Sequence, residues 1–488
     1  MKSSLLLFTA IATSALGALP SVGPDYSVPS APVPSAYRDA DASAWKIASP
    51  DDSASRGEWW KVFGDPALDA LETRALDANQ DLKAAAARVD QARAAAGLAH
   101  SSYWPQLALN SSVAHGRTSG TTDNAAPQLE TTTQQASVNV SWELDLFGRV
   151  RRLNESARAD ADASAALFES FRLSLAAEVA VNYFSLRAFD REIALVQQTT
   201  ALRHRALDLV SAREKNGAAG DLDVARAETE LASVEAEAAA LANRRAATQN
   251  ALAILLGVPG SDFALTPSPN VESTPAAVPA GLPASLLERR PDIAAAERTL
   301  AAAYARIGVA KAAFFPAISL TGGAGYASAD LDRLFTADSR VWSIGPSLYL
   351  PIFQGGRNRA NLARSRAAFD ESVAIFRQRV LVAFREVQDA LSATQFLATQ
   401  AAAQERALDS AHRAARLAQT RYDAGFVTYF EVIDAQRTSL ALERANTQLI
   451  AQRLNNEVAL IKALGGGWHR EAAMLAAHQS SSALPLVN

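Results

Sequence analysis

Cysteine is absent from the 488 residues, which excludes disulfides, thiolate metal sites and a cysteine nucleophile. Only 2 methionines are present, so a methionine-rich copper relay is not expected. Neither charge sign dominates: the net charge of −4 argues against a nucleic-acid-binding protein, which carries clustered basic side chains. No later stretch reaches the roughly 18 apolar residues that a transmembrane helix needs. A membrane location would therefore depend on strands.

The first residues have the pattern of a secretory signal peptide. Lys2 supplies positive charge, the apolar run Leu5–Ala12 follows, and small residues include Gly17 and Ala18. We expect residues 1–18 to be removed by cleavage near these two positions. The alternative is a buried N-terminal helix.

The chain contains a long internal repeat. Segments 81–116 and 292–327 align without a gap at an offset of 211 residues (292 − 81), and from Arg149 and Arg357 onward the offset is 208 (357 − 149). A repeat of this length is too long for a solenoid unit and indicates a duplicated half with internal pseudo-twofold symmetry. The predicted division is an extended tail at 19–58, a first repeat at 59–258, a proline-rich linker at 259–283, a second repeat at 284–467 and a C-terminal tail at 468–488.

Proline and glycine placement predicts long helices in both repeats. Proline is absent from Gln128 to Val258 and from Ile352 to Leu484, and proline inside a helix costs about 3 kcal/mol. Gly217 and Gly425 are repeat equivalents within these tracts, where a helix should end and the chain should turn. Each repeat is expected to hold one helix of about 65 residues and a returning helix of about 35 residues.

Alternating apolar and polar residues predict strands near 106–147 and 317–353. Val138, Val140 and Trp142 alternate with polar residues, a period of two. Roughly ten tilted residues cross an outer membrane, although a soluble sandwich is the alternative. Four strands cannot close a barrel, for which about eight are needed, and unpaired edges are not tolerated in lipid. If these strands meet lipid, the chain must oligomerise.

The combination resembles the TolC-family outer-membrane efflux proteins, in the OprM-like (NodT-type) branch. The motifs that carry the likeness are VGPDY (Val22–Tyr26), WWKVFGDPALDAL (Trp59–Leu71), ELDLFGR (Glu143–Arg149), LLERRPDIAAAE (Leu286–Glu297), AAFFPAISLTGGAGY (Ala312–Tyr326), PIFQGGRNRA (Pro351–Ala360), RYDAG (Arg421–Gly425) and DAQR (Asp434–Arg437). They are spread over nearly the whole chain.

The resemblance implies a mainly α-helical homotrimer with a membrane β-barrel in the cell outer membrane. Four strands from each of three chains would form a 12-stranded barrel in outer-membrane lipid, and helical hairpins would form a trimeric α-barrel through the periplasm. The function implied is passive exit duct of a tripartite drug or small-molecule efflux pump. Its partners would be a periplasmic adaptor (membrane fusion protein) and an inner-membrane RND-type pump.

One departure concerns lipidation. OprM-like relatives usually have a lipid-bearing cysteine just before the VGPDY-like motif, whereas Leu19, Pro20 and Ser21 stand there in this chain. We therefore expect either an unacylated protein held by its barrel alone or a sequence altered at this position.

The two predicted helical turns carry the candidate functional residues. The first hairpin end is Arg213–Glu228, and the second hairpin end is Arg421–Arg437. By resemblance, the second lines a periplasmic gate, with Phe430 as an apolar ring and Asp434 as an acidic ring. Possible links holding the gate shut are Arg421, Tyr422, Asp423 and Arg226. The turn residues expected to face the adaptor are Gly217, Ala218, Ala219, Gly425, Phe426 and Val427. The alternative for the gate and link residues is an ordinary solvated helix end, and the alternative for the turn residues is a plain C-cap turn.

No residue constellation supports an enzyme or a bound cofactor. The six histidines are scattered, and the repeat equivalents His204 and His412 are better explained as solvated helix positions than as a shared metal site. Two other functions stay open: the outer-membrane duct of a protein-secretion system, and a periplasmic coiled-coil scaffold without a pore.

Overall fold

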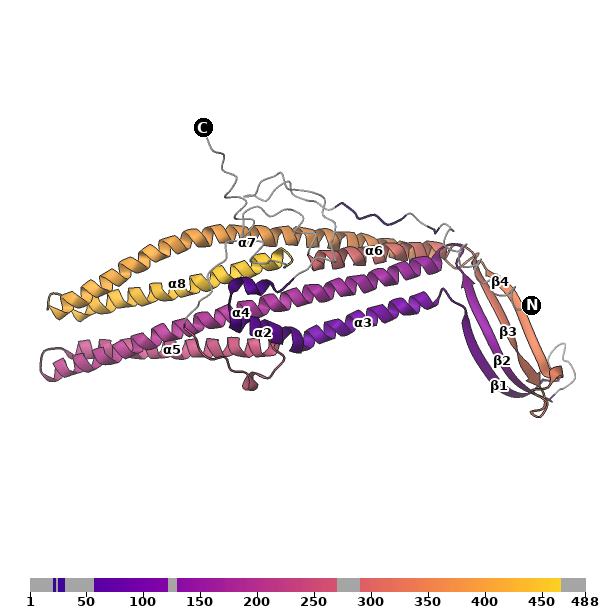
Figure 1. Cartoon of the computed structure of the whole chain (residues 1–488), viewed down its shortest axis with the longest axis horizontal. Helices are drawn as coiled ribbons and strands as arrows, with labels where there is room; N and C mark the ends of the chain where they lie inside the picture. The colour runs from indigo at the N-terminus through magenta and orange to yellow at the C-terminus, as the bar shows by residue number, and fades with distance from the viewer. Residues whose placement is uncertain (1–20, 23–24, 31–56, 122–129, 270–289, 467–488) are drawn as a thin grey trace, which may run out of the picture. The chain divides into compact units, whose positions relative to one another are not determined.

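The computed structural model describes residues 21–22, 25–30, 57–121, 130–269 and 290–466. The predicted signal peptide, the position of Pro20 and the C-terminal tail lie outside the described residues, as does most of the predicted linker. Figure 1 shows the elements. In chain order they are η2 (Trp59–Phe63), α2 (Pro66–Ala78), α3 (Gln80–Ser101), β1 (Gln106–Arg117), β2 (Glu130–Leu144), α4 (Arg149–Lys215), α5 (Asp221–Leu255), η3 (Gly260–Asp262), α6 (Pro291–Ala312), β3 (Ala317–Ser328), η5 (Ala337–Ser339), β4 (Arg340–Tyr349), α7 (Arg357–Asp423) and α8 (Tyr429–Ala463).

The helices repeat with the offsets of the sequence. α4 and α7 are both 67 residues long and begin 208 residues apart, as do α5 and α8, both 35 residues long. α3 and α6 are both 22 residues long and begin 211 residues apart (291 − 80). The predicted lengths of about 65 and about 35 residues are confirmed.

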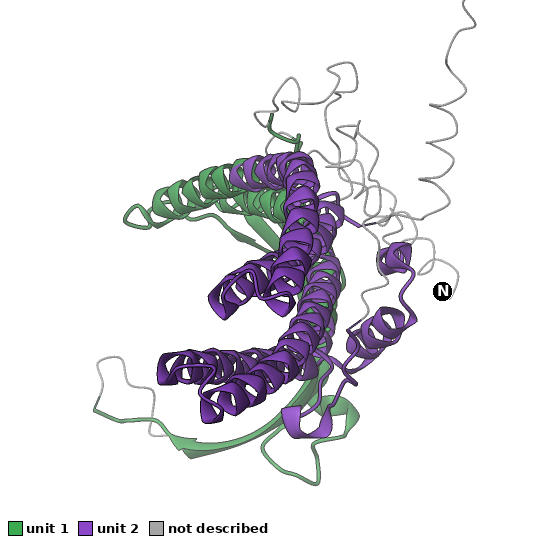
Figure 2. Ribbon diagram, turned by 90° about the vertical axis from the view of Figure 1, so that its left-hand side faces the viewer, with its two compact units in different colours: residues 1–31, 88–165, 295–377 green, residues 32–87, 166–294, 378–488 purple. Residues whose placement is uncertain are grey.

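The chain divides into two compact units, coloured separately in Figure 2. Unit 1 comprises residues 1–31, 88–165 and 295–377, and unit 2 comprises residues 32–87, 166–294 and 378–488. Among the described residues, no helix combines the length and the apolar character that crossing a membrane requires.

Unit 1 contains one antiparallel sheet with the strand order β1-β2-β3-β4. Leu109 pairs with Val138, which pairs with Ala324, which pairs with Trp342, so this row of side chains crosses all four strands. The predicted strands are confirmed, except that β2 and β4 end at Leu144 and Tyr349, a few residues before the predicted limits.

The alternation of side chains and this register give the sheet two different faces. We call the apolar face the one that carries Leu107, Leu109, Val113, Val138, Val140, Trp142, Leu320, Trp342, Ile344 and Leu348. The opposite, polar face carries Ala108, Asn110, Ser112, Asn139, Ser141, Ser319, Thr321, Ser343 and Ser347. Leu109 is 74% exposed and Trp342 is 78% exposed, so the described chain leaves its apolar face uncovered.

The core of unit 2 forms where η2 and α2 pack against α4, α5 and α8. Trp59, Leu68, Phe184, Leu252 and Leu454 belong to one buried cluster there. Removing apolar surface of this kind from water contributes about 25 cal/mol per Å².

Aspartates start two of the helices by accepting backbone N–H groups. In α2, the Asp65 carboxylate accepts from Ala67 N at 2.9 Å, next to Pro66 at the first helical position. In α4, Asp145 accepts from Val150 N at 3.1 Å and from Arg151 N at 2.8 Å. In the repeat motifs LDLFGR and LPIFQGGR, Pro351 aligns with Asp145, and its side chain cannot accept such hydrogen bonds.

Candidate functional site

The two hairpin ends turn through the same backbone geometry. At the first, Gly217 N donates to Glu214 O at 2.8 Å and Ala218 N donates to Arg213 O at 2.8 Å. At the second, the equivalent bonds run from Gly425 N to the Tyr422 carbonyl at 2.9 Å and from Phe426 N to the Arg421 carbonyl at 2.8 Å. The two glycines have φ of 72° and 77°, the left-handed values that close a helix C-terminus.

The predicted adaptor-facing residues lie at these turns, mostly exposed. Phe426 is 77% exposed, while Ala219 and Val427 are half-buried. Gly217, Ala218 and Gly425 are exposed. Glycine and alanine at these positions leave little side-chain bulk over the backbone of either turn.

Phe430 and Asp434 lie one turn apart at the start of α8, and both are exposed. The guanidinium carbon of Arg226, on α5, lies 5.8 Å from the centre of the Phe430 ring, within the range of a cation–π contact. Arg226 also lies 3.9 Å from Asp223 of its own helix. The structure thus brings Arg226 and Phe430 together, two residues that the sequence placed in one gate.

Tyr422 connects the two hairpin ends. Its hydroxyl accepts a hydrogen bond from Arg213 of α4, whose guanidinium carbon lies 5.1 Å from the centre of the tyrosine ring. Asp423 instead accepts a bond from Gln419 of its own helix at 2.8 Å, and Arg421 is exposed. Arg213 is the repeat equivalent of Arg421 (421 − 208), a signal that could have identified it.

Sequence reasoning missed a buried charge cluster that begins about one helical turn beyond Asp434 on α8. Glu230 of α5 is 6% exposed, and its carboxylate accepts a bond from Arg437 Nε of α8 at 2.9 Å. Arg203 of α4, 3% exposed, lies 3.9 Å from the same carboxylate and donates to Gln436 of α8 at 2.8 Å. This Glu230 cluster (Glu230, Arg203, Arg437 and Gln436) ties three helices together through charged hydrogen bonds.

Tyr429, the first residue of α8, lies beside this cluster. Burial raises the pKa of its phenol, and the Arg203 guanidinium opposes part of that rise. The phenol therefore stays protonated at neutral pH and can serve as a hydrogen-bond donor.

A second ion-paired cluster lies farther along the same helices. Arg444 of α8 donates to Glu192 of α4 at 3.2 Å and also pairs with Glu237 of α5. The histidines hold equivalent places in the two repeats: His204 lies 3.3 Å from Glu235, and His412 lies 2.7 Å from Glu443.

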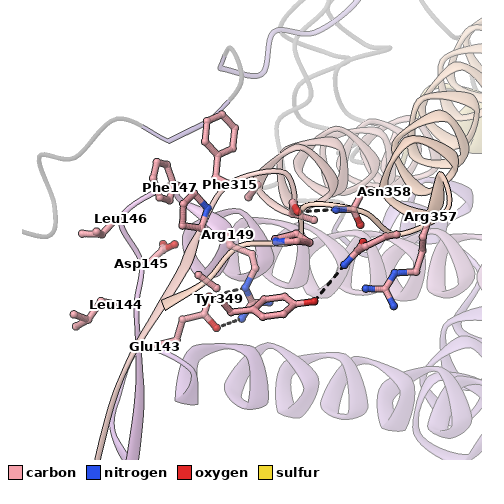
Figure 3. Close-up of a pocket in the computed structure, with 16 residues that line it drawn as sticks. Glu143, Leu144, Asp145, Leu146, Phe147, Arg149, Phe315, Tyr349, Arg357 and Asn358 are labelled. Atoms are coloured by element: carbon pink, nitrogen blue, oxygen red, sulfur yellow. Dashed lines mark hydrogen bonds and ion pairs between the residues drawn. The ribbon is translucent and has the colours of Figure 1, made fainter. Parts of the chain in front are cut away.

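Unit 1 contains a pocket of about 160 Å³ where β2 meets α4 and β4 meets α7 (Figure 3). Glu143 accepts from Arg149 Nε at 2.7 Å, and Asn358 donates to the Ala313 carbonyl at 2.8 Å. The Phe147 and Phe315 rings stack at 4.9 Å. Because Glu143 and Arg149 pair with each other, this pocket is better explained as a structural junction between sheet and helices than as a reaction site.

The sheet and the paired hairpins can be compared with known proteins. The family model described as outer membrane efflux protein matches residues 71–258 and 282–466. The chain belongs to the outer membrane efflux protein family. The toluene efflux pump outer membrane protein TtgI of Pseudomonas putida is 36% identical over 453 residues, covering 92% of this chain and 95% of that protein.

Two further relatives support the assignment. The cation efflux system protein CusC of Escherichia coli is 34% identical over 454 residues, covering 92% of this chain and 96% of that protein. The solved outer-membrane channel OprN matches with a TM-score of 0.82 at 32% identity, covering 92% of this chain and 99% of that chain. The resemblance read from the motifs is confirmed, and the chain is an efflux channel protein of the cell outer membrane.

Proposed function

We propose that three copies of this chain form an outer-membrane channel that is the passive exit duct of a tripartite efflux pump. The observation that carries this proposal is the sheet of unit 1, which has one exposed apolar face and one polar face. Closed with two further copies into 12 strands, such a sheet would turn its apolar face to lipid and its polar face to a water-filled lumen.

The gate in this proposal lies at the hairpin ends. Repeated by threefold symmetry, Phe430 would form an apolar constriction and Asp434 an acidic collar that attracts cations. The Tyr422–Arg213 contact and the Glu230 cluster would hold the second hairpin against the first in the closed state.

The proposed partners are a periplasmic adaptor at the exposed turns and an inner-membrane pump of the RND type. The turn residues at 217–219 and 425–427 expose small or apolar groups, which suits docking between helical hairpins. Relatives are named for toluene and for cation efflux, so the proposed cargo is a small molecule or ion. The channel itself would catalyse no reaction, and the pump would supply the energy.

Single-channel conductance in planar bilayers tests the gate. Phe430→Ala should raise the closed-state conductance, and Asp434→Asn should reduce selectivity for cations, because each change acts at all three copies. The matched control is Leu222→Ala, at the repeat equivalent of Phe430 (430 − 208). Arg226→Ala should raise conductance to a smaller extent, since it removes only the cation–π contact.

Two results would contradict this proposal. A purified native complex with the mass of one chain would contradict the trimeric channel. Equal conductance in wild type, Phe430→Ala and Asp434→Asn would contradict a gate formed by these residues. An unchanged Arg226→Ala conductance would remove Arg226 alone from it.

A further inference from the structure

The start of α4 pairs its arginines with carboxylates that precede the helix. Arg149 donates to Glu143 through Nε at 2.7 Å and through Nη2 at 2.5 Å. Two residues later, Arg151 Nε donates to Asp145 at 3.2 Å. Each of these two guanidinium groups therefore has its own anion, supplied by the end of β2 or by the turn that follows it.

The second repeat keeps both arginines. Arg357 and Arg359 are the equivalents of Arg149 and Arg151, 208 residues later (357 − 149). Both side chains are exposed, and neither has a hydrogen-bond or ion-pair partner among the described residues. α7 begins at Arg357 with no acidic residue in its first turn, so the N–H groups at its N-terminus add to this positive charge.

The two carboxylates of the first repeat have no counterpart in the second. Before the helices the repeat offset is 206 (349 − 143), because the motif YLPIFQGGR is two residues longer than ELDLFGR. Tyr349 therefore stands where Glu143 does, and Pro351 stands where Asp145 does. Neither side chain is a carboxylate. The start of α7 thus holds the cationic half of a pair whose anionic half the described chain does not supply.

The unpaired Arg357 lines the pocket of unit 1 (Figure 3). The bonded Glu143–Arg149 pair belongs to the same lining, so the paired and the unpaired arginine border one cavity. Tyr349 also lines it, and its hydroxyl accepts a hydrogen bond from Gln354 Nε2 at 3.3 Å. The hydroxyl hydrogen of Tyr349 can therefore be donated to a ligand.

The remaining wall of the pocket is largely apolar. It includes Leu146 and Phe147 from the first repeat and Phe315, Pro316 and Pro351 from the second. An apolar wall with a few convergent polar groups is typical of small-molecule sites. The volume of about 160 Å³ is below the roughly 300–1,000 Å³ of sites for drug-sized ligands, so the pocket suits a smaller molecule.

We infer that this pocket binds a small organic carboxylate, whose anionic group pairs with Arg357 and whose apolar part lies against Phe315 and Pro316. The ligand supplies to the second repeat the anion that Glu143 supplies to Arg149 in the first, in the two-donor geometry that a guanidinium favours. The site goes beyond the proposed function, because it requires only the fold of unit 1.

The sheet indicates how a ligand reaches the pocket. Glu143 pairs with Ser319 of the polar face, and Tyr349 lies two residues beyond Ser347 of the same face. Both side chains therefore continue the polar-face rows. In the proposed channel this face borders the lumen, so a carboxylate would enter from the lumen. This route, unlike the site itself, rests on the proposed function.

Isothermal titration calorimetry of the purified full-length protein in mild detergent tests the site, with benzoate as the probe. Benzamide has the same ring without the charge, so it separates ion pairing from apolar packing. Inorganic phosphate has the charge without the apolar part, so it separates a carboxylate site from a general anion site.

Two variants change the charge of the pocket in different ways. Arg357→Gln removes the guanidinium, whereas Tyr349→Glu keeps it and supplies a carboxylate at the place that Glu143 holds in the first repeat. Arg366→Gln, at an exposed arginine of α7 outside the pocket, is the matched control. Because Arg357 is exposed and Tyr349 is 62% exposed, both variants should fold, which tryptophan-fluorescence melting curves verify.

We expect wild type and Arg366→Gln to bind benzoate alike, and each pocket variant to bind it roughly ten- to a hundredfold more weakly, the factor for one charge-assisted pair. Benzamide should bind wild type more weakly by a similar factor. No saturable benzoate binding to wild type, or equal binding to all four proteins, overturns the site.

The other probes can overturn parts of the inference. Equal affinities for benzoate and benzamide overturn the pairing with Arg357, and tighter binding of phosphate than of benzoate overturns the carboxylate assignment. A native mass of one chain, with benzoate still bound, contradicts the proposed channel and leaves the site in place. A native mass of three chains without benzoate binding does the reverse.

Discussion

The two hairpin ends share a backbone but differ in side-chain chemistry. Both follow a helix of 67 residues and precede one of 35 residues, and both close with a left-handed glycine. In the first hairpin end, Leu222 and Arg226 occupy the positions that Phe430 and Asp434 occupy in the second. Backbone geometry depends on a few glycines and on the absence of proline, so duplication can preserve it while exposed positions diverge.

The divergence has made the two ends complementary. Arg226 of the first lies over the Phe430 ring of the second, and Arg213 bonds to Tyr422. Glu230 of α5 pairs with Arg437 of α8, whereas their repeat equivalents are threonines, Thr438 and Thr229. Exact repeats would carry glutamate at position 438 and arginine at position 229 as well, so the presence of this pair in one direction only reflects divergence of the repeats.

The largest expected loss of stability comes from substituting the buried Glu230, which belongs to the first hairpin. Glu230→Ala leaves the Arg203 guanidinium buried with Gln436 but without its carboxylate partner, and should lower the free energy of unfolding by about 4 kcal/mol. The matched change at the repeat equivalent, Thr438→Ala, removes only a hydroxyl bonded to the Asp434 carbonyl in its own helix. Thermal unfolding of the purified protein measures both, and equal shifts would show that the Glu230 cluster does not hold the hairpins together.

A second buried carboxylate sharpens the contrast because no ion pair with a cation forms there among the described residues. Glu72 of α2 is fully buried, and neither carboxyl oxygen has a hydrogen-bond partner among the described residues. Burial raises the pKa of Glu72 to about 9, and the Asp69 carboxylate adds to the rise. Glu72 is therefore protonated in the folded protein at neutral pH, whereas Glu230 lies between two arginines.

The raised pKa predicts a loss of stability with rising pH. Between the ordinary value of 4.5 and about 9, the folded state binds a proton that the unfolded state has released, so stability falls as pH rises through this window. From pH 5.5 to 7.5 the loss should be about 3 kcal/mol. Glu72→Gln should flatten this slope in tryptophan-fluorescence melting curves, for which the buried Trp59 of unit 2 is a reporter. The exposed-site control Glu58→Gln should keep the slope, and an unchanged slope in Glu72→Gln would contradict a buried neutral carboxyl.

The smallest effect should be the same at both hairpin ends. A Cβ added at Gly217 or Gly425 would meet no atom within 4 Å, so alanine there costs only the left-handed backbone conformation, about 1 kcal/mol. Gly217→Ala and Gly425→Ala should therefore lower the melting temperature by equal amounts. Unequal shifts would mean that the two turns differ in packing as well as in side-chain chemistry.

Much of the fold could be predicted from the sequence, and so could parts of the site. Gly217 and Gly425 located the ends of α4 and α7, because proline-free tracts leave few positions where a long helix can stop. Alternation at Val138 and Val140 located β2. The gate residues remain predictions, although the structure places Arg226 beside Phe430.

The Glu230 cluster could not be predicted for a physical reason. Arg437 and Glu230 are 207 residues apart, and no local pattern records which helix of one repeat faces which helix of the other. The repeat does not help to find this pair either, since the position equivalent to Glu230 is Thr438, which carries no charge. Arg213, which bonds to Tyr422, could have been found from the sequence, because its repeat equivalent Arg421 is among the predicted link residues.

The sequence by itself determined the length of each helix, the places where the chain turns, the alternation of each strand and the family, because these depend on residue type and local spacing. Only the tertiary structure decided the strand register, the complementary contacts between the hairpin ends, and which carboxylates are buried with or without a partner. Those features depend on distances between residues far apart in the chain, where packing, desolvation and ion pairing are settled together.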